Sequence, residues 1–172
     1  MHAPWLTLLH SYRDPLHHLE REQVCTGCDR LSVGALGPGV SVLEGQTQIL
    51  RVLKHTVAEA QRGKVNALVF IGDAMEESAD ALIGAAGELA LRGVPAFIFH
   101  EGGEDPAGSV FRKIAALTKG AYSQFHAGSA KELRDLLTAV AVFAAGGRKA
   151  LTDYGKRTGG AALQLTQGFD TR

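Results

Sequence analysis

Acidic and histidine side chains gather directly after two apolar runs of the chain, at residues 67–71 and 96–99. Each run has the length and the continuous apolar character of a strand that is covered on both faces of a parallel sheet. Ligands of open α/β sheets bind where such strands end. The polar residues at these two points are therefore the candidate contacts for a ligand or a partner: Asp73, Glu76, Glu77, His100 and Glu101.

A carboxylate at the end of a strand suits a hard cation such as Mg²⁺ or Mn²⁺, which takes oxygen ligands. Asp73 supplies such a carboxylate, and the hydroxyl group of Thr47 can add a second oxygen. The same residues also suit a structural role, because Asp73 with Glu76 fits a helix N-cap with its capping-box partner, and Thr47 fits an N-cap. Both interpretations stay open.

Cys25 and Cys28 form a single Cys-x-x-Cys pair. The pair can be half of a weak metal site, a redox pair or two plain thiols, and plain thiols are favoured because too few further ligands are spaced as zinc sites require. The glycine-rich residues 34–39 are not a phosphate-binding loop, since no Lys-Ser or Lys-Thr ends the run. No motif of a metalloprotease or of a serine hydrolase occurs in the chain.

Regular elements that can position these residues begin at Gly45. Hydrophobic periodicity predicts three helices, and Ser129 with Glu132 forms a capping box that opens a fourth, which Gly146 and Gly147 end. The spacing of the strands is that of βα units, so we expect a three-layer, doubly wound, Rossmann-like α/β sheet, mostly parallel, with helices on both faces. Gly84 and Gly87 are explained by close packing of their helix on the sheet. The helices are predicted at 46–62, 76–92, 107–119 and 129–147, and the strands at 67–71, 96–99 and 121–125.

The rest of the chain is less regular. Residues 1–44 are an irregular N-terminal segment with one or two strands, at 6–9 and 40–43. The α/β core follows at 45–155, and residues 156–172 are a C-terminal tail with a short strand at 161–165. Together they form a single domain.

Composition restricts the function. The chain has 172 residues, and its 18 basic side chains balance its 18 acidic side chains. No basic excess indicates a nucleic acid or an anionic membrane surface as partner. No apolar run is long enough to span a membrane, no signal peptide is evident, and two cysteines do not form a disulfide framework. The expected location is the cytoplasm.

Five segments taken together resemble a von Willebrand factor A domain, most closely the small cytoplasmic proteins of bacteria in that class. Residues 45–49 read GQTQI and residues 67–77 read ALVFIGDAMEE, while 93–102 read GVPAFIFHEG. The similarity continues through residues 119–122 and 143–151 and covers roughly 40–155.

The resemblance implies a metal-ion-dependent adhesion site that grips the carboxylate of a partner. Its second and third segments fall on Thr47 and Asp73. Its first segment, Asp-x-Ser-x-Ser, occurs nowhere in the chain, and by position residues 6–11 look like the second strand of the family. The metal site is therefore expected to be degenerate or incomplete.

A missing first strand would expose one edge of the strand at 67–71, and an open edge favours pairing with another chain. A homodimer is expected unless residues 6–11 cover that edge. We therefore predict a protein–protein interaction module rather than an enzyme, with an AAA-type ATPase or the chain itself as partner. Its predicted contacts are Thr47, Asp73, Glu76, Glu77, His100 and Glu101. The alternatives are a Mg²⁺-dependent hydrolase or phosphotransferase around Asp73, and a structural subunit of a homo-oligomer.

Overall fold

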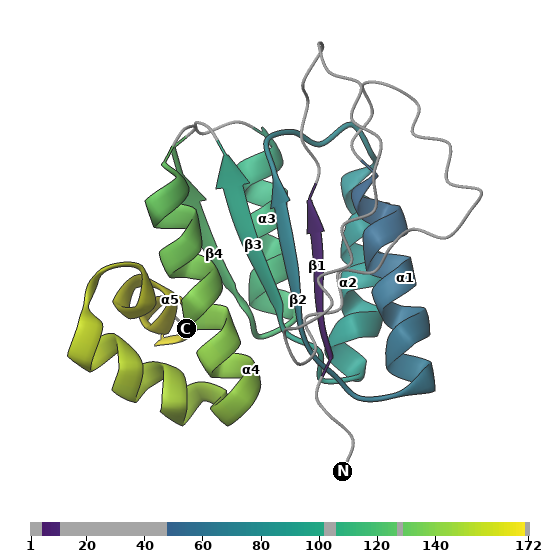
Figure 1. The fold of residues 1–172 in the computed structure, drawn as a ribbon. Coiled ribbons are helices and arrows are strands. Elements are labelled where there is room, and N and C mark those ends of the chain that lie inside the picture. The colour runs from purple at the N-terminus through teal and green to yellow at the C-terminus, as the bar shows by residue number, and fades with distance from the viewer. Residues whose placement is uncertain (1–4, 11–47, 102–105, 127–128, 171–172) are drawn as a thin grey trace, which may run out of the picture.

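A computed structural model of the chain describes residues 5–10, 48–101, 106–126 and 129–170. Strands and helices alternate along these ranges (Figure 1). The elements are β1 (Trp5–His10), α1 (Ile49–Arg62), β2 (Val65–Gly72), α2 (Ala79–Leu91), β3 (Ala96–Glu101), α3 (Pro106–Leu117), β4 (Ala121–Phe125), α4 (Ala130–Thr158) and α5 (Gly160–Asp170).

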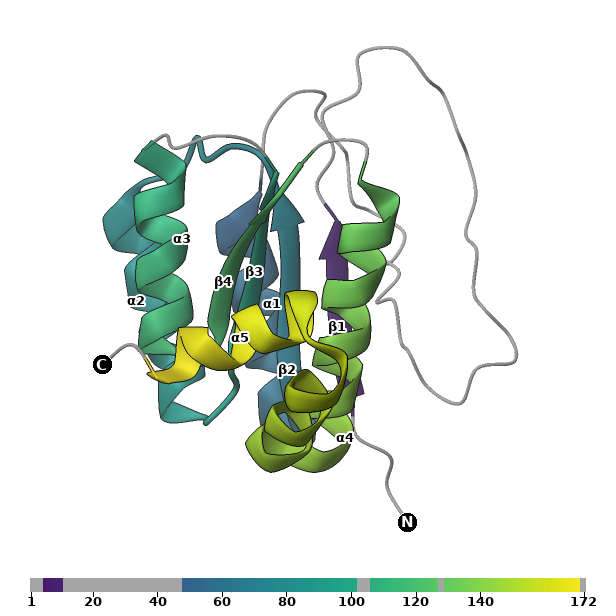
Figure 2. The same cartoon turned by 90° about the vertical axis from the view of Figure 1, so that its left-hand side faces the viewer.

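The strands form one sheet in the order β1-β2-β3-β4, and each neighbouring pair is parallel. Helices α1, α2 and α3 cover one face, and α4 and α5 cover the other (Figures 1 and 2). The predicted parallel α/β sheet with helices on both faces is confirmed. The described strands follow chain order, so the reversal of strand order that a doubly wound sheet requires does not occur among them.

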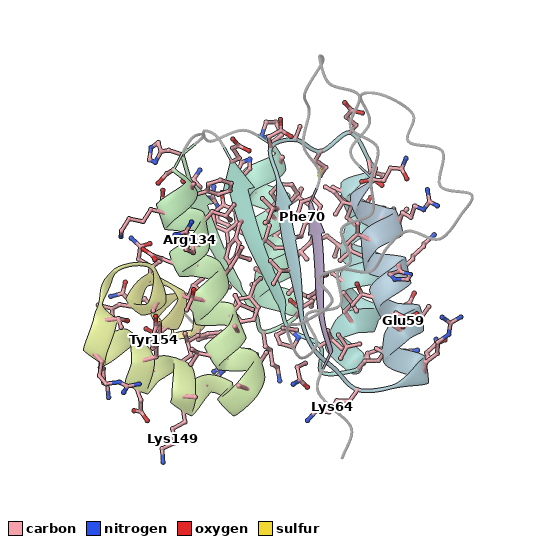
Figure 3. The ribbon with its side chains drawn as sticks, in the orientation of Figure 1. Glu59, Lys64, Phe70, Arg134, Lys149 and Tyr154 are labelled. Atoms are coloured by element: carbon pink, nitrogen blue, oxygen red, sulfur yellow. The ribbon has the colours of Figure 1, made fainter. Side chains whose placement is uncertain are left out.

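Strand β2 explains why the apolar runs are continuous. Leu68 and Phe70 face α1, α2 and α3, whereas Val69 and Ile71 face α4 and α5. Phe70 points into the protein interior, while Lys64 and Lys149 lie at its surface (Figure 3). Because both faces of the strand are covered, every side chain from position 67 to position 71 is buried, as expected for a central parallel strand.

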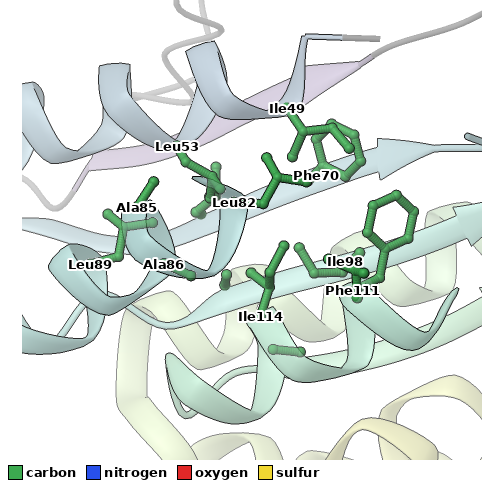
Figure 4. Packing of buried hydrophobic residues seen from close by; sticks show 14 of the residues in the cluster. Ile49, Leu53, Phe70, Leu82, Ala85, Ala86, Leu89, Ile98, Phe111 and Ile114 are labelled. Atoms are coloured by element: carbon green, nitrogen blue, oxygen red, sulfur yellow. The ribbon is translucent and has the colours of Figure 1, made fainter. Parts of the chain in front are cut away.

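The larger of the two cores lies between the sheet and its first three helices (Figure 4). Phe70 packs edge-to-face against Phe111 of α3 with their ring centroids 5.7 Å apart. Leu53 from α1 and Leu82 from α2 are also buried in this core. These contacts link the three helices to the strands whose ends carry the candidate residues.

Helix α2 begins three residues later than predicted, at Ala79, with Ser78 as its N-cap residue. Asp73 and Glu76 therefore do not cap it, and that structural interpretation is wrong. A side-chain carbon added at Gly84 or Gly87 of this helix would have no atom within 4 Å. Close packing on the sheet therefore does not explain these two glycines.

The C-terminal part of the chain is helical. Helix α4 is broken at Gly147, whose φ is 69° and ψ −163°, at the glycine pair expected to end it. Ser129 is the N-cap residue but makes no side-chain cap hydrogen bond, so the predicted capping box does not form. The strand predicted at 161–165 is wrong, because this segment lies within α5. Its buried side chains recur with helical spacing: Ala162, Leu165, Thr166 and Phe169.

Strand β1 covers the edge of β2 that was expected to be open, with Leu8 of β1 in register with Val69 of β2. The edge argument for a homodimer therefore loses its premise.

None of the helices in the described ranges combines the length and the apolar character that crossing a membrane demands.

Candidate functional site

The candidate residues lie at the carboxyl edge of the sheet, toward which the strand arrows point at the top of Figure 1. Gly72 of β2 is in register with His100 of β3. Asp73 and Glu101 are therefore the next positions on the two neighbouring strands. The fold thus places the start of the loop after β2 next to the end of β3, and it places α1 beside the loop after β2.

Glu77 joins the loop after β2 to the start of helix α1. Its carboxylate accepts hydrogen bonds from the backbone N–H groups of Ile49, at 2.7 Å, and Leu50, at 2.9 Å. The first N–H groups of a helix have no partner within the helix and carry its positive dipole end, so a carboxylate there is favourable. Glu77 thus serves as the N-terminal cap of α1, and the N-cap residue Gln48 makes no side-chain cap hydrogen bond itself.

Asp73 and Glu76 lie on the same loop but are not engaged in this way. Asp73 is half-buried and Glu76 is exposed. Neither carboxylate makes a hydrogen bond or ion pair with any part of the chain that the structure describes. Glu101, at the end of β3, is half-buried and likewise makes no side-chain bond within the described ranges. The edge therefore carries three carboxylates that make no bond within the described ranges.

His100 is fully buried and does not lie on the surface of this edge. Its Nδ1 lies 2.8 Å from the hydroxyl oxygen of Tyr122 in β4. Its Nε2 lies 3.2 Å from the backbone carbonyl oxygen of Asp73. The imidazole thus links β3 to β4 and to the Asp73 loop, and its burial leaves it no surface for direct contact with a partner.

Helix α3 completes the surroundings of this imidazole. The Phe111 ring packs edge-to-face against it, with the two centroids 5.2 Å apart. Gly108 leaves room beside it, since an added side-chain carbon would lie 3.4 Å from both the imidazole and the Tyr122 hydroxyl oxygen. The guanidinium of Arg112 lies over the Tyr122 ring, 5.0 Å from its centroid. Sequence reasoning missed these residues, because only the strand register places β4, and only helix packing places α3, next to His100.

The donor set of a metal ion is not assembled among the residues that the structure describes: no group of three or more His, Cys, Asp or Glu side chains has a suitable arrangement there. Asp73 is one predicted ligand, and Glu77 beside it is committed to α1. Thr47, Cys25 and Cys28 lie outside the described residues. The described residues therefore do not fit a tight magnesium or manganese site, which needs more oxygen ligands.

The segment after β4, at the same edge of the sheet, contributes His126 as its described polar side chain next to the strand. His126 is exposed, and its backbone N–H donates to a carboxylate oxygen of Glu132 at 3.4 Å. Glu132 therefore reaches back past the start of α4 to the end of β4. This contact joins the end of β4 to the first turn of α4.

Comparison with known proteins gives no relative from which to transfer a function: no family model, no curated protein and no solved structure matches the chain. The described residues show a small α/β domain whose parallel strands alternate with helices. The sequence and the structure are therefore the only basis for inferring a function.

Proposed function

We propose that this chain is a protein-binding module of the von Willebrand factor A type with a degenerate metal site. It binds a basic segment of a partner protein through the acidic carboxyl edge of its sheet. The observation that most strongly supports this proposal is a contrast on the loop after β2. Glu77 is bound to α1, while the carboxylates of Asp73 and Glu76 make no bond within the described residues. A fixed loop with available carboxylates supports recognition of Lys and Arg side chains.

The surroundings of the loop support binding without a metal. Glu101 adds a further carboxylate at the end of the neighbouring strand. Negative groups that lie close together attract a cationic partner over a distance and speed its association. The contact is then predicted to weaken as salt concentration rises, because exposed charges are screened. An AAA-type ATPase or a second copy of the chain remains a candidate partner.

The test is affinity capture from the cells that produce the protein, with the wild-type chain and an Asp73→Asn/Glu76→Gln double variant as baits. Both substitutions remove charge and leave size unchanged. We expect one or more partners that the wild type captures and the double variant loses. The captured partner is then purified, and its dissociation constant is measured against both baits at two salt concentrations.

Glu88→Gln is the matched control, because Glu88 is exposed near the opposite end of α2 and the substitution removes the same kind of charge. The control bait should capture the same partners as the wild type. Equal capture by the double variant would show that the edge is not the contact surface. Equal loss with the control would show a general charge effect.

A further inference from the structure

We propose that the buried His100 and the half-buried Tyr122 form a positioning pair that holds the Asp73 loop in its binding conformation. The inference rests on the proposed function for its purpose, although the positioning itself is a property of the loop. The loop after β2 is held at two points. Glu77 holds its far end to α1, and His100 holds the backbone carbonyl of Asp73 at its near end. Glu76 lies between these two points.

The two contacts of His100 assign its proton. A carbonyl oxygen only accepts hydrogen bonds, so the contact with Asp73 requires that Nε2 carries hydrogen and donates. In a neutral ring Nδ1 then holds a lone pair, and the Tyr122 hydroxyl group donates to it. Tyr122 therefore fixes the tautomer, and the tautomer fixes the hydrogen bond to the loop, as hydrogen bonds to one ring nitrogen set the role of the other.

The packing around the ring fixes its orientation. Phe111 packs edge-to-face on the imidazole at an interplanar angle of 89°, and Gly108 allows the helix to approach the ring closely. A fully buried imidazole with both nitrogens in contact loses two hydrogen bonds if it rotates. The carbonyl of Asp73 is consequently held in one place, and with it the backbone position from which the carboxylate of the same residue projects.

The first experiment is a long-range ¹H–¹⁵N correlation spectrum of the histidine side chains in the full chain. His100 is expected to show a protonated Nε2 and an unprotonated Nδ1, with a slowly exchanging hydroxyl proton on Tyr122. A ring with a protonated Nδ1 and a bare Nε2, or a ring that averages both tautomers, would overturn the assignment.

The second experiment measures amide hydrogen exchange across residues 73–78 in His100→Phe and Tyr122→Phe. The first variant keeps an aromatic ring and removes both hydrogen bonds, and the second removes only the hydroxyl group. Exchange in the loop is expected to accelerate about five- to tenfold, the factor that corresponds to about one lost hydrogen bond. Partner capture should fall in parallel.

Leu165→Ala is the control, since Leu165 is fully buried in the core on the other face of the sheet and does not contact His100. It should lower global stability while the relative exchange of the loop stays unchanged. If His100→Phe does not fold, Tyr122→Phe alone decides the question. Unchanged loop exchange in Tyr122→Phe, or equal acceleration in Leu165→Ala, would overturn the proposal.

The two proposals fail in different ways. If loop exchange accelerates in His100→Phe and Tyr122→Phe while Asp73→Asn/Glu76→Gln captures the same partners as the wild type, the positioning pair stands and the proposed function fails. If loop exchange does not change in His100→Phe or Tyr122→Phe while Asp73→Asn/Glu76→Gln abolishes capture, the proposed function stands and the positioning pair is refuted.

Discussion

Three acidic residues on one short loop have different environments, although they lie within five positions of one another. The Glu77 carboxylate is bound by two backbone N–H groups of α1, whereas Asp73 and Glu76 have no side-chain bond in the described chain. Nothing in the local sequence distinguishes these roles, because Ile49 lies 28 positions before Glu77. Only the packing of α1 beside the loop decides which carboxylate becomes a cap.

The cap predicts that two neighbouring glutamates contribute differently to the free energy of unfolding. Glu77→Ala should lower the free energy of unfolding by about 1–3 kcal/mol, because two charge-assisted hydrogen bonds at a helix N-terminus are lost. Glu76→Ala should change it by less than about 0.5 kcal/mol, as is usual for an exposed side chain. Urea denaturation of the two variants measures both values, and equal costs would contradict the assignment of the cap.

A second contrast at the residue scale concerns glycine. A side-chain carbon on Gly120 would clash with the backbone carbonyl group of Ala96, and backbone atoms cannot move aside as a side chain can. Gly120→Ala is therefore expected to destabilise the fold by about 3 kcal/mol or more. The exposed Gly84, in the interior of α2, has open space around it, and Gly84→Ala should stabilise by about 0.5–1 kcal/mol through helix propensity. Thermal unfolding of the pair tests both signs.

At the scale of elements, α5 shows how a short apolar segment is misread. Residues 161–165 are apolar enough for a strand, but the burial of Leu165 and Phe169 four positions apart is a helical pattern. Gly159 and Gly160 have positive φ values of 65° and 57°, which turn the chain back after α4. Phe169 then packs on Phe97 of β3, with the ring centroids 5.9 Å apart.

This packing makes α5 part of the core. Leu165→Ala should lower the free energy of unfolding by about 2–5 kcal/mol, because its side chain is fully buried. Leu163→Ala on the same helix is the control. Leu163 is 39% exposed, so its substitution should cost much less. A small effect at both positions would mean that α5 is a loosely attached tail.

At the scale of the whole molecule, chain-order strands place α1, α2 and α3 on one face of the sheet. Adjacent strands that are added in one direction keep their crossover helices on the same side, because such crossovers are right-handed. The chain reaches the other face only with α4. The ends of β2 and β3 therefore lie beside helices α1 and α3, and the acidic edge forms without a strand-order reversal among the described strands.

This arrangement also predicts the response to metal ions. We expect no heat in isothermal calorimetry when chelator-stripped protein is titrated with millimolar Mg²⁺ or Mn²⁺, because the described residues do not gather the oxygen ligands of a tight site. Asp73→Ala should behave in the same way. Binding tighter than about 1 mM, or roughly −4 kcal/mol, that vanishes in Asp73→Ala would show a rebuilt metal site and contradict this expectation.

The sequence by itself determined the class of the fold and the place of the candidate site. Apolar runs and their spacing predicted β2, β3 and β4, and the residues that follow the first two runs, Asp73 and His100 among them, do lie together at one edge. Local patterns are sufficient for these predictions, because the spacing of apolar residues within one segment indicates a buried strand or an amphipathic helix.

The tertiary structure alone decided which of these side chains are buried or bonded within the fold. His100 is buried against Tyr122, and Glu77 is bound to α1, while Asp73 and Glu76 keep their carboxylates available. These roles depend on contacts between residues 22 to 28 positions apart. Strand register and helix packing create such contacts, and periodicity within any single segment does not record them.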